Sequence, residues 1–283
     1  MVVPQLSFEV FPPRSLKAAF DLWDTRQALS PFAPDFFSVT YGAGGSAVAQ
    51  SEETLQALRS QNSGTEGIVA HITSAGASEP ETLAFAIRQI EAGQRDFVAL
   101  RGDVRKGVQS WASAPDLISH LKGLGAKRIF VAGYPEVHPE AASPQADLDQ
   151  LKAKLDAGAD EIITQFVFEP EAFLRWRDRV RSAGITAPIR AGILPIKDWR
   201  KAKGFAARCG ATWPAELDLA FTHAQRCSET KLLAVAQAAE LCDKLLIEGQ
   251  SALHIYTLNS ADLTRQVLLA LGCAPKTKLL QAA

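Results

Sequence analysis

Eight short runs rich in β-branched and aromatic residues alternate with longer helical patterns along the chain, and this alternation restricts the fold more than any other feature. Strands that are each followed by a helix form a parallel sheet, because parallel neighbours need a long crossover connection. The predicted strands are Gln5–Phe11, Phe36–Thr40, Gly67–Ile72, Asp96–Leu100, Arg128–Ala132, Glu161–Gln165, Pro188–Ile193 and Ala252–Thr257. Helices are predicted over residues 15–29, 47–61, 79–93, 112–124, 144–157, 170–183, 197–209, 230–248 and 261–271.

Eight such units fit a closed (β/α)8 TIM barrel better than an open sheet, and a barrel typically takes about 250 residues, close to the 283 of this chain. No G-x-G-x-x-G sequence follows a predicted strand, so a Rossmann nucleotide site has no support. No linker marks a boundary, and we expect a single barrel domain over residues 1–283, with 274–283 as a flexible tail. The weakly patterned stretch Gly210–Glu229 is expected to be a lid, a short additional helix or an oligomer contact.

Composition excludes several classes of function. A net charge of -1 gives no reason to expect nucleic acid or an anionic membrane as partner. No apolar run approaches the roughly 20 residues that span a bilayer, and the first residues lack the pattern of a signal peptide, so we expect a cytoplasmic protein. The four cysteines contain no C-x-x-C pair and the five histidines no H-x-x-x-H spacing, which predicts free thiols and no metal site.

Glu9 lies near the end of the first predicted strand, on the same face as Ser7 and Phe11. A carboxylate in a buried strand is costly unless it is paired, protonated or used. From this stretch alone, a structural glutamate bonded to backbone amides or to an arginine is as well supported as a functional one.

Polar and glycine-rich segments follow the other predicted strands as well. In a (β/α)8 barrel the carboxyl ends of the strands carry the active site. Each segment has a structural explanation of its own, such as a tight turn, a local ion pair or, for Phe205, core packing with Trp199 and Ala202. Their coincidence on one rim is what favours a functional site. The segments are Thr40–Gly45, His71–Thr73, Arg101–Asp103, Tyr134–Glu140, Thr164–Gln165, Gly192–Pro195 and Tyr256–Asn259.

Taken together and in order, these segments resemble the bacterial 5,10-methylenetetrahydrofolate reductases, from residue 6 to about 275. The most specific piece is the run Tyr134-Pro-Glu-Val-His-Pro-Glu140. The other matching pieces are Ser7–Arg14, Ser38–Ala43, His71–Thr73, Ala99–Asp103, Gln145–Leu148, Leu151–Lys154, Asp156–Ala159, Ile163–Phe166, Gly192–Pro195 and Tyr256–Asn259.

The resemblance implies a barrel that holds FAD and serves one-carbon metabolism and methionine biosynthesis. Such enzymes pass hydride from NADH or NADPH to the flavin, and then between 5,10-methylenetetrahydrofolate and 5-methyltetrahydrofolate. It implies folate and nicotinamide nucleotide as partners and leaves a homo-oligomer possible. Two alternatives stay open: a flavin-free reductase of the same fold with direct hydride transfer, and a non-catalytic folate- or flavin-binding subunit.

The resemblance also implies roles for individual residues. Glu9 resembles the general acid, and Asp103 the carboxylate beside flavin and pterin. Gln165 resembles the amide that reads the pterin, and Phe205 the ring that packs on folate or nicotinamide. Further substrate contacts are implied for Thr40, Tyr256 and Leu258. The residues implied to contact FAD are Thr40, His71, Leu100, Arg101, Gly102, Asp103, Trp111, Ala112, Tyr134, His138, Ala141, Asp147 and Lys154.

Four positions depart from the family pattern, of which Ala191, in place of a common proline before Gly192, is expected to be structural. Ala153 and Gln150 stand where Arg and Asn are common near the FAD diphosphate, which is the motive for the flavin-free alternative. Ser260 stands where an Arg would meet the glutamate tail of folate.

Overall fold

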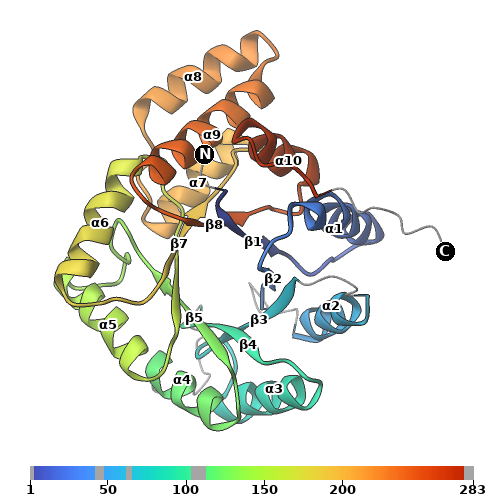
Figure 1. Cartoon of the computed structure of the whole chain (residues 1–283), viewed down its shortest axis with the longest axis vertical. Coiled ribbons are helices and arrows are strands. Elements are labelled where there is room, and N and C mark those ends of the chain that lie inside the picture. Colours follow the sequence, from blue (N-terminus) through green and yellow to red (C-terminus); the bar gives the residue numbers. More distant parts are fainter. Residues whose placement is uncertain (1–2, 42–47, 62–65, 103–112, 277–283) are drawn as a thin grey trace.

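Eight parallel strands close into a barrel in chain order, with β1 beside β8, in a computed structural model that describes residues 3–41, 48–61, 66–102 and 113–276 (Figure 1). The predicted TIM barrel is therefore confirmed. The strands are β1 (Gln5–Val10), β2 (Phe36–Val39), β3 (Gly67–Thr73), β4 (Asp96–Leu100), β5 (Arg128–Gly133), β6 (Glu161–Thr164), β7 (Ile189–Ile193) and β8 (Ala252–Tyr256).

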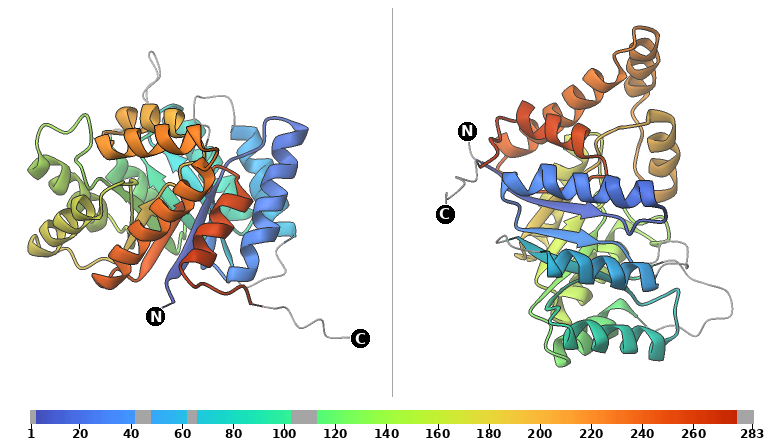
Figure 2. Two further views of the ribbon diagram at one scale, coloured as in Figure 1. Left: turned by 90° about the horizontal axis from the view of Figure 1, so that it is seen from above. Right: turned by 90° about the vertical axis from the view of Figure 1, so that its right-hand side faces the viewer.

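Helices surround this barrel, and none of those within the described ranges is both long and apolar enough to cross a membrane. The helices are α1 (Leu16–Leu29), α2 (Val48–Ser60), α3 (Glu79–Glu91), α4 (Ala114–Gly123), α5 (Pro144–Asp156), α6 (Pro170–Ser182), α7 (Trp199–Cys209), α8 (Ala215–Arg226), α9 (Thr230–Ile247) and α10 (Ala261–Ala270), with a 3₁₀ turn over Ser30–Phe32. Of the possibilities for Gly210–Glu229, the additional helix is confirmed as α8. It packs against α9 and projects beyond the ring (Figure 2).

Local sequence signals explain where several helices begin. The side chains of Ser15, Ser113 and Ser143 each accept a hydrogen bond from the backbone N–H three residues later, which satisfies one of the free donors at a helix start. Proline follows within two residues of Ser113 and Ser143, where its missing N–H costs nothing. These caps fix the starts of α1, α4 and α5 close to the predicted positions.

Side chains fill the interior of the barrel at the amino ends of the strands. Arg190 is buried there between Glu161 and Asp35, with nitrogen–oxygen distances of 2.6 and 2.7 Å. Its guanidinium lies 5.0 Å from the centre of the Phe36 ring. A buried apolar layer of Phe36, Val69, Val98, Phe130 and Ile163 follows above it. Any cavity inside the barrel must therefore open at the carboxyl ends of the strands.

The predicted tail 274–283 lies partly outside the described residues. Of the part that is described, Lys276 donates its backbone N–H to the carbonyl oxygen of Pro31. A flexible tail stays a prediction.

Gly192 on β7 occupies a position that tolerates no side chain. A Cβ atom there would lie 2.1 Å from the carbonyl oxygen of Thr164 and 2.9 Å from the ring of Tyr256. The absence of a side chain lets β6, β7 and the Tyr256 ring approach one another beneath the mouth of the barrel.

Gly192→Ala is expected to lower the free energy of unfolding by about 3 kcal/mol or more, because the backbone contact cannot relax without moving β6. Gly123→Ala is the matched control, since a Cβ at Gly123 would meet no atom within 4 Å and alanine favours a helix. Denaturant unfolding of both variants checks this. Equal stability of the two variants would contradict the steric account.

Candidate active site

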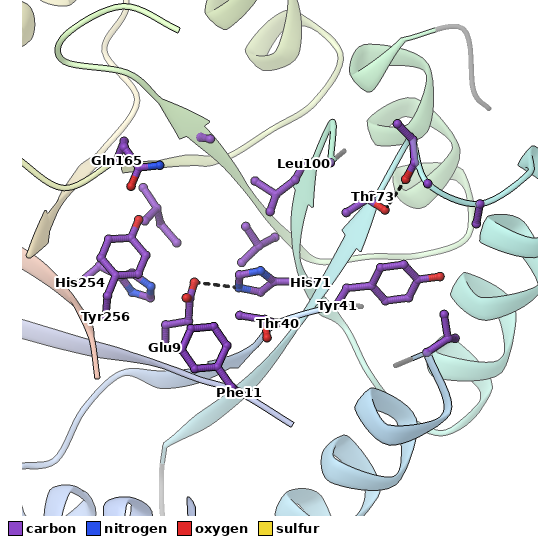
Figure 3. Close-up of a pocket in the computed structure, with 18 of the residues that line it drawn as sticks. Glu9, Phe11, Thr40, Tyr41, His71, Thr73, Leu100, Gln165, His254 and Tyr256 are labelled. Atoms are coloured by element: carbon purple, nitrogen blue, oxygen red, sulfur yellow. Dashed lines mark hydrogen bonds and ion pairs between the residues drawn. The ribbon is translucent and has the colours of Figure 1, made fainter. Parts of the chain in front are cut away.

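A cavity of about 1000 Å³ opens at the carboxyl ends of the strands, where the sequence predicted a site (Figure 3). Its walls bring together residues that are far apart in the sequence, from β1 to the loop after β8. The predicted site residues that line it are Glu9, Thr40, His71, Leu100, Gly102, Tyr134, Gln165, Phe205, Tyr256 and Leu258.

Glu9 stands at the centre of this group, between His71 on β3 and the pair of His254 and Tyr256 on β8 (Figure 3). Its carboxylate oxygen Oε2 lies 3.6 Å from Nε2 of His71, and both side chains are almost completely buried. That distance exceeds a hydrogen bond. Consistently, Nε2 of His71 has no hydrogen-bond partner among the described residues. The carboxyl group thus keeps hydrogen-bonding capacity for a ligand.

Burial decides the protonation of this pair. It raises the pKa of Glu9 from 4.5 to about 8 and lowers the pKa of His71 from 6.5 to about 3. Although the 3.6 Å distance meets a distance criterion for an ion pair, both shifts favour the neutral forms. At neutral pH the pair is a protonated acid beside a neutral imidazole. Of the two explanations for Glu9, the structural one with an arginine or backbone partner receives no support.

His254 is a cavity residue that the sequence interpretation treated only as one of several scattered histidines. It lies on β8 two residues before Tyr256, so strand alternation was the signal that could have placed it inside the barrel. The hydroxyl of Ser7 donates to the carbonyl of Leu253 and also contacts Nδ1 of His254 at 2.8 Å. The direction of the Ser7–His254 hydrogen bond depends on the tautomer of the imidazole, and in either direction the bond orients the ring.

The Tyr256–Asn259 segment fixes the end of β1 and hence the backbone that carries Glu9. Thr257 donates its hydroxyl to the carbonyl of Glu9 at 2.6 Å. The side-chain amide of Asn259 both accepts from the N–H and donates to the carbonyl of Phe11, at 2.9 and 3.0 Å. Leu258 and Asn259 both adopt positive φ angles, which turns the chain tightly enough for these bonds.

Aromatic rings form the wall opposite His71. Phe205 on α7 lies 5.2 Å from the ring of Phe166, which in turn lies 6.0 Å from Tyr256. The hydroxyl of Tyr256 donates to the carbonyl of Thr164, and Gln165 accepts from the N–H of Phe166 through its amide oxygen. Phe205 is partly buried and lines the cavity. Core packing alone therefore does not explain the position of its ring.

A small side pocket of about 70 Å³ shares Tyr134 with the main cavity and contains Asp147 and Lys154. Nζ of Lys154 donates to the carbonyl of Ala132 at 2.9 Å. Burial lowers the pKa of Lys154 to about 8, an effect that the carboxylate of Asp147 opposes. Burial also raises the pKa of Asp147. A buried cation facing a pocket is suited to an anionic ligand.

Three further predicted cofactor residues line neither the main cavity nor the side pocket and lie in the loops of the rim. Arg101 forms an ion pair with Glu140. His138 packs edge-on against Tyr134 with ring centres 4.6 Å apart, and the carbonyl of His138 accepts from the N–H of Ala141. The predictions for Asp103, Trp111 and Ala112 lie outside the described residues. Within the described part of the chain, no group of three metal-ligating side chains occurs.

The cavity also contains residues that were not named individually as site residues from the sequence, although Tyr41 and Thr73 fall within the predicted rim segments. Many are small or apolar, and strand or helix position alone does not single them out. They are Phe11, Tyr41, Val48, Thr73, Ala75, Gly76, Ala77, Glu81, Ala84, Arg88, Val98, Ala132, Ile163, Phe166 and His254.

Comparison with known proteins finds relatives over nearly the whole chain. The family model described as "Methylenetetrahydrofolate reductase" matches residues 3–272. The chain is 40% identical over 272 residues to 5,10-methylenetetrahydrofolate reductase of Salmonella typhimurium, covering 95% of this chain and 91% of that one. It is also 34% identical to methylenetetrahydrofolate reductase (NADH) 1 of Arabidopsis thaliana, covering 96% of this chain and 49% of the plant protein.

A solved structure shares the fold at low identity. It is an uncharacterised protein from Clostridium thermocellum, described as binding two copies of 5-methyl-5,6,7,8-tetrahydrofolic acid. The TM-score is 0.66 at 14% identity, over 95% of this chain and 94% of that one.

Glu9→Gln is expected to make stability less dependent on pH. Folding raises the pKa of Glu9 to about 8, so its protonated form stabilises the native state below about pH 4.5, and this contribution is lost as pH rises toward 8. The variant should therefore be more stable than the wild type by on the order of 3 kcal/mol at pH 8, and by little at pH 4.5.

Denaturant unfolding of both proteins between pH 4.5 and 8 measures this difference. His71 works in the opposite direction, because its contribution is lost as pH falls from 6.5 toward 3, but it is present in both proteins. Parallel stability curves for the two proteins would show that the Glu9 carboxyl does not retain its proton.

Proposed function

The chain belongs to the methylenetetrahydrofolate reductase family, and we propose that it interconverts 5,10-methylenetetrahydrofolate and 5-methyltetrahydrofolate with NADH or NADPH through bound FAD. The observation that carries this proposal is the protonated, buried Glu9 in a cavity of about 1000 Å³. A cavity of this size can bury a flavin ring and a second flat ring together.

The acid answers a specific chemical need of this substrate. The methylene group bridges N5 and N10 of the folate, and hydride can add only after the bond to N10 opens to an N5 iminium ion. The electron pair of the broken bond stays on N10 and must take up a proton. Glu9 supplies that proton and becomes a carboxylate, and hydride addition to the iminium carbon then gives the methyl group.

The surroundings of Glu9 suit this transfer. His71 is neutral and stands 3.6 Å away, so it does not hold the carboxyl proton in a short hydrogen bond. The clamp of Thr257 and Asn259 on the backbone of β1 restricts where the carboxyl group can point. A fixed acid loses little entropy when the substrate arrives.

The residues present fit FAD, which when bound would carry hydride between nicotinamide and folate. Tyr134 connects the cavity to the side pocket, where Lys154 offers a buried cation for phosphate and Asp147 an acceptor for hydroxyl groups. His71 offers ring nitrogen Nε2, which forms no hydrogen bond with the part of the chain that the structure describes. Lys154 would supply a cationic contact on the side where Ala153 replaces an arginine.

The remaining rim residues are proposed to bind the flat rings of the two substrates. Phe205 would stack on pterin or nicotinamide in turn, because its ring projects from α7 into the cavity beside Phe166. Gln165 would read the pterin edge through its amide. Thr40, Tyr256 and Leu258 would add contacts from β2 and β8. Asp103, Trp111 and Ala112 keep the roles that the family resemblance implies.

Two relatives support the choice of ligands. The Arabidopsis protein carries NADH in its name, which supports a nicotinamide nucleotide as donor. The Clostridium thermocellum protein, with the same fold, is described as binding methyltetrahydrofolate. A folate is therefore compatible with the mouth of such a barrel.

The absorption spectrum of the purified protein tests the proposal. We expect a flavin band that bleaches with NADH or NADPH under anaerobic conditions and returns when methylenetetrahydrofolate is added. Without a flavin band after incubation with FAD, turnover by the protein alone would point to direct hydride transfer. A protein that neither binds flavin nor turns over folate would leave only the non-catalytic alternative.

Glu9→Gln is expected to slow folate reduction by about 100-fold or more, because an amide cannot protonate N10. Reduction of bound flavin by NADH needs no such proton and should change by less than about threefold. Stopped-flow measurement of the two half-reactions separates these effects. Glu53→Gln, which alters an exposed carboxylate on α2, is the control. Equal losses in both half-reactions would rule out the acid role.

A further inference from the structure

A hydrogen bond joins two loops on the rim that are 76 residues apart in sequence. The carboxylate of Glu136, in the loop between β5 and α5, accepts the backbone N–H of Thr212 at 2.9 Å. Thr212 lies in the turn between α7 and α8. A bond from an amide to a charged acceptor is stronger than one between neutral groups.

The two loops also fit closely around this bond. Gly210 ends α7 in a left-handed conformation with φ of 72°, and a Cβ there would lie 2.8 Å from Pro139. On the other loop, Val137 has φ of 70°, which is costly for a β-branched residue. The surrounding structure must therefore hold Val137 in this conformation. The preceding residue, Glu136, forms the hydrogen bond to the other loop.

Each loop carries a wall of the cavity. Tyr134 lies two residues before Glu136 and lines both the main cavity and the side pocket. Phe205 lies on α7, five residues before Gly210, and also lines the main cavity. On its other side the α7–α8 turn is held by Trp213, whose ring packs 4.9 Å from Phe168. The hydrogen bond of Glu136 to Thr212 therefore joins the loop that follows Tyr134 to the turn that follows the helix of Phe205.

We propose that Glu136 is a positioning residue that ties the end of α7 to the Tyr134 loop and so sets where Phe205 stands in the cavity. The expected effect of Glu136 on substrate binding rests on the proposed function, in which Phe205 stacks on pterin or nicotinamide. Glu136 itself does not line the main cavity among the described residues and acts only through the loop that it holds.

Three variants test this inference. Glu136→Ala removes the acceptor and should raise the KM for methylenetetrahydrofolate by about tenfold, with kcat changed by less than about twofold. Glu136→Gln keeps an oxygen that accepts the same N–H, so its KM should stay within about threefold of the wild type. Thr212→Ala keeps the backbone donor and should match the wild type. An unchanged KM in Glu136→Ala, or an equal rise in Glu136→Gln, would overturn the proposal.

Hydrogen exchange gives a readout that needs no substrate. Peptides covering residues 203–213 should exchange at least about tenfold faster in Glu136→Ala than in the wild type, and at the wild-type rate in Glu136→Gln. Unchanged exchange in Glu136→Ala would show that Glu136 does not hold the end of α7, even if activity fell. If the wild type turned over no folate, the proposed function would fail, and exchange alone would decide whether Glu136 positions α7.

Discussion

The burial of the Glu9 carboxyl group is the constraint on which the site depends. Most of it is shielded from solvent, and the titratable group that faces it at 3.6 Å is a histidine that burial also keeps neutral. Two neutral groups at 3.6 Å neither repel each other nor form an ion pair that would lower the pKa of the acid. Placing a positive charge beside Glu9 would stabilise the carboxylate and remove the proton that the proposed chemistry needs.

The rest of the barrel is arranged so that this carboxyl group can stay buried. Below it, Arg190 and its two carboxylates close the amino end, and an apolar layer separates those charges from the cavity. Above it, Thr257 and Asn259 hold β1 to the loop after β8 by bonds to the backbone. Charges are therefore satisfied at one end of the barrel, and the acid at the other end keeps its proton. The buried acid lowers stability at alkaline pH, as expected where function and stability compete.

Hydrophobic periodicity and capping residues were enough to predict the barrel and nearly all its elements from sequence, because local patterns decide strand and helix type. α8 was harder. Leu217 packs against the core whereas Leu219, two residues later, is exposed, so apolar residues alone do not define the buried face of this helix. The sequence did not identify His254 and Arg88 as cavity residues. The direction in which such a side chain points depends on the elements packed around its strand or helix, and the sequence of that element alone does not show it.

The sequence by itself determined the order of strands and helices, the rim on which the polar segments meet and, through the family resemblance, the residues proposed to act there. Only the tertiary structure decided that Glu9 and His71 are neutral, that His254 faces the cavity and that Glu136 holds the turn after α7. The physical reason is that periodicity is local in the chain. A pKa depends on the groups and solvent around a side chain, and a hydrogen bond between residues 76 apart depends on their separation in space.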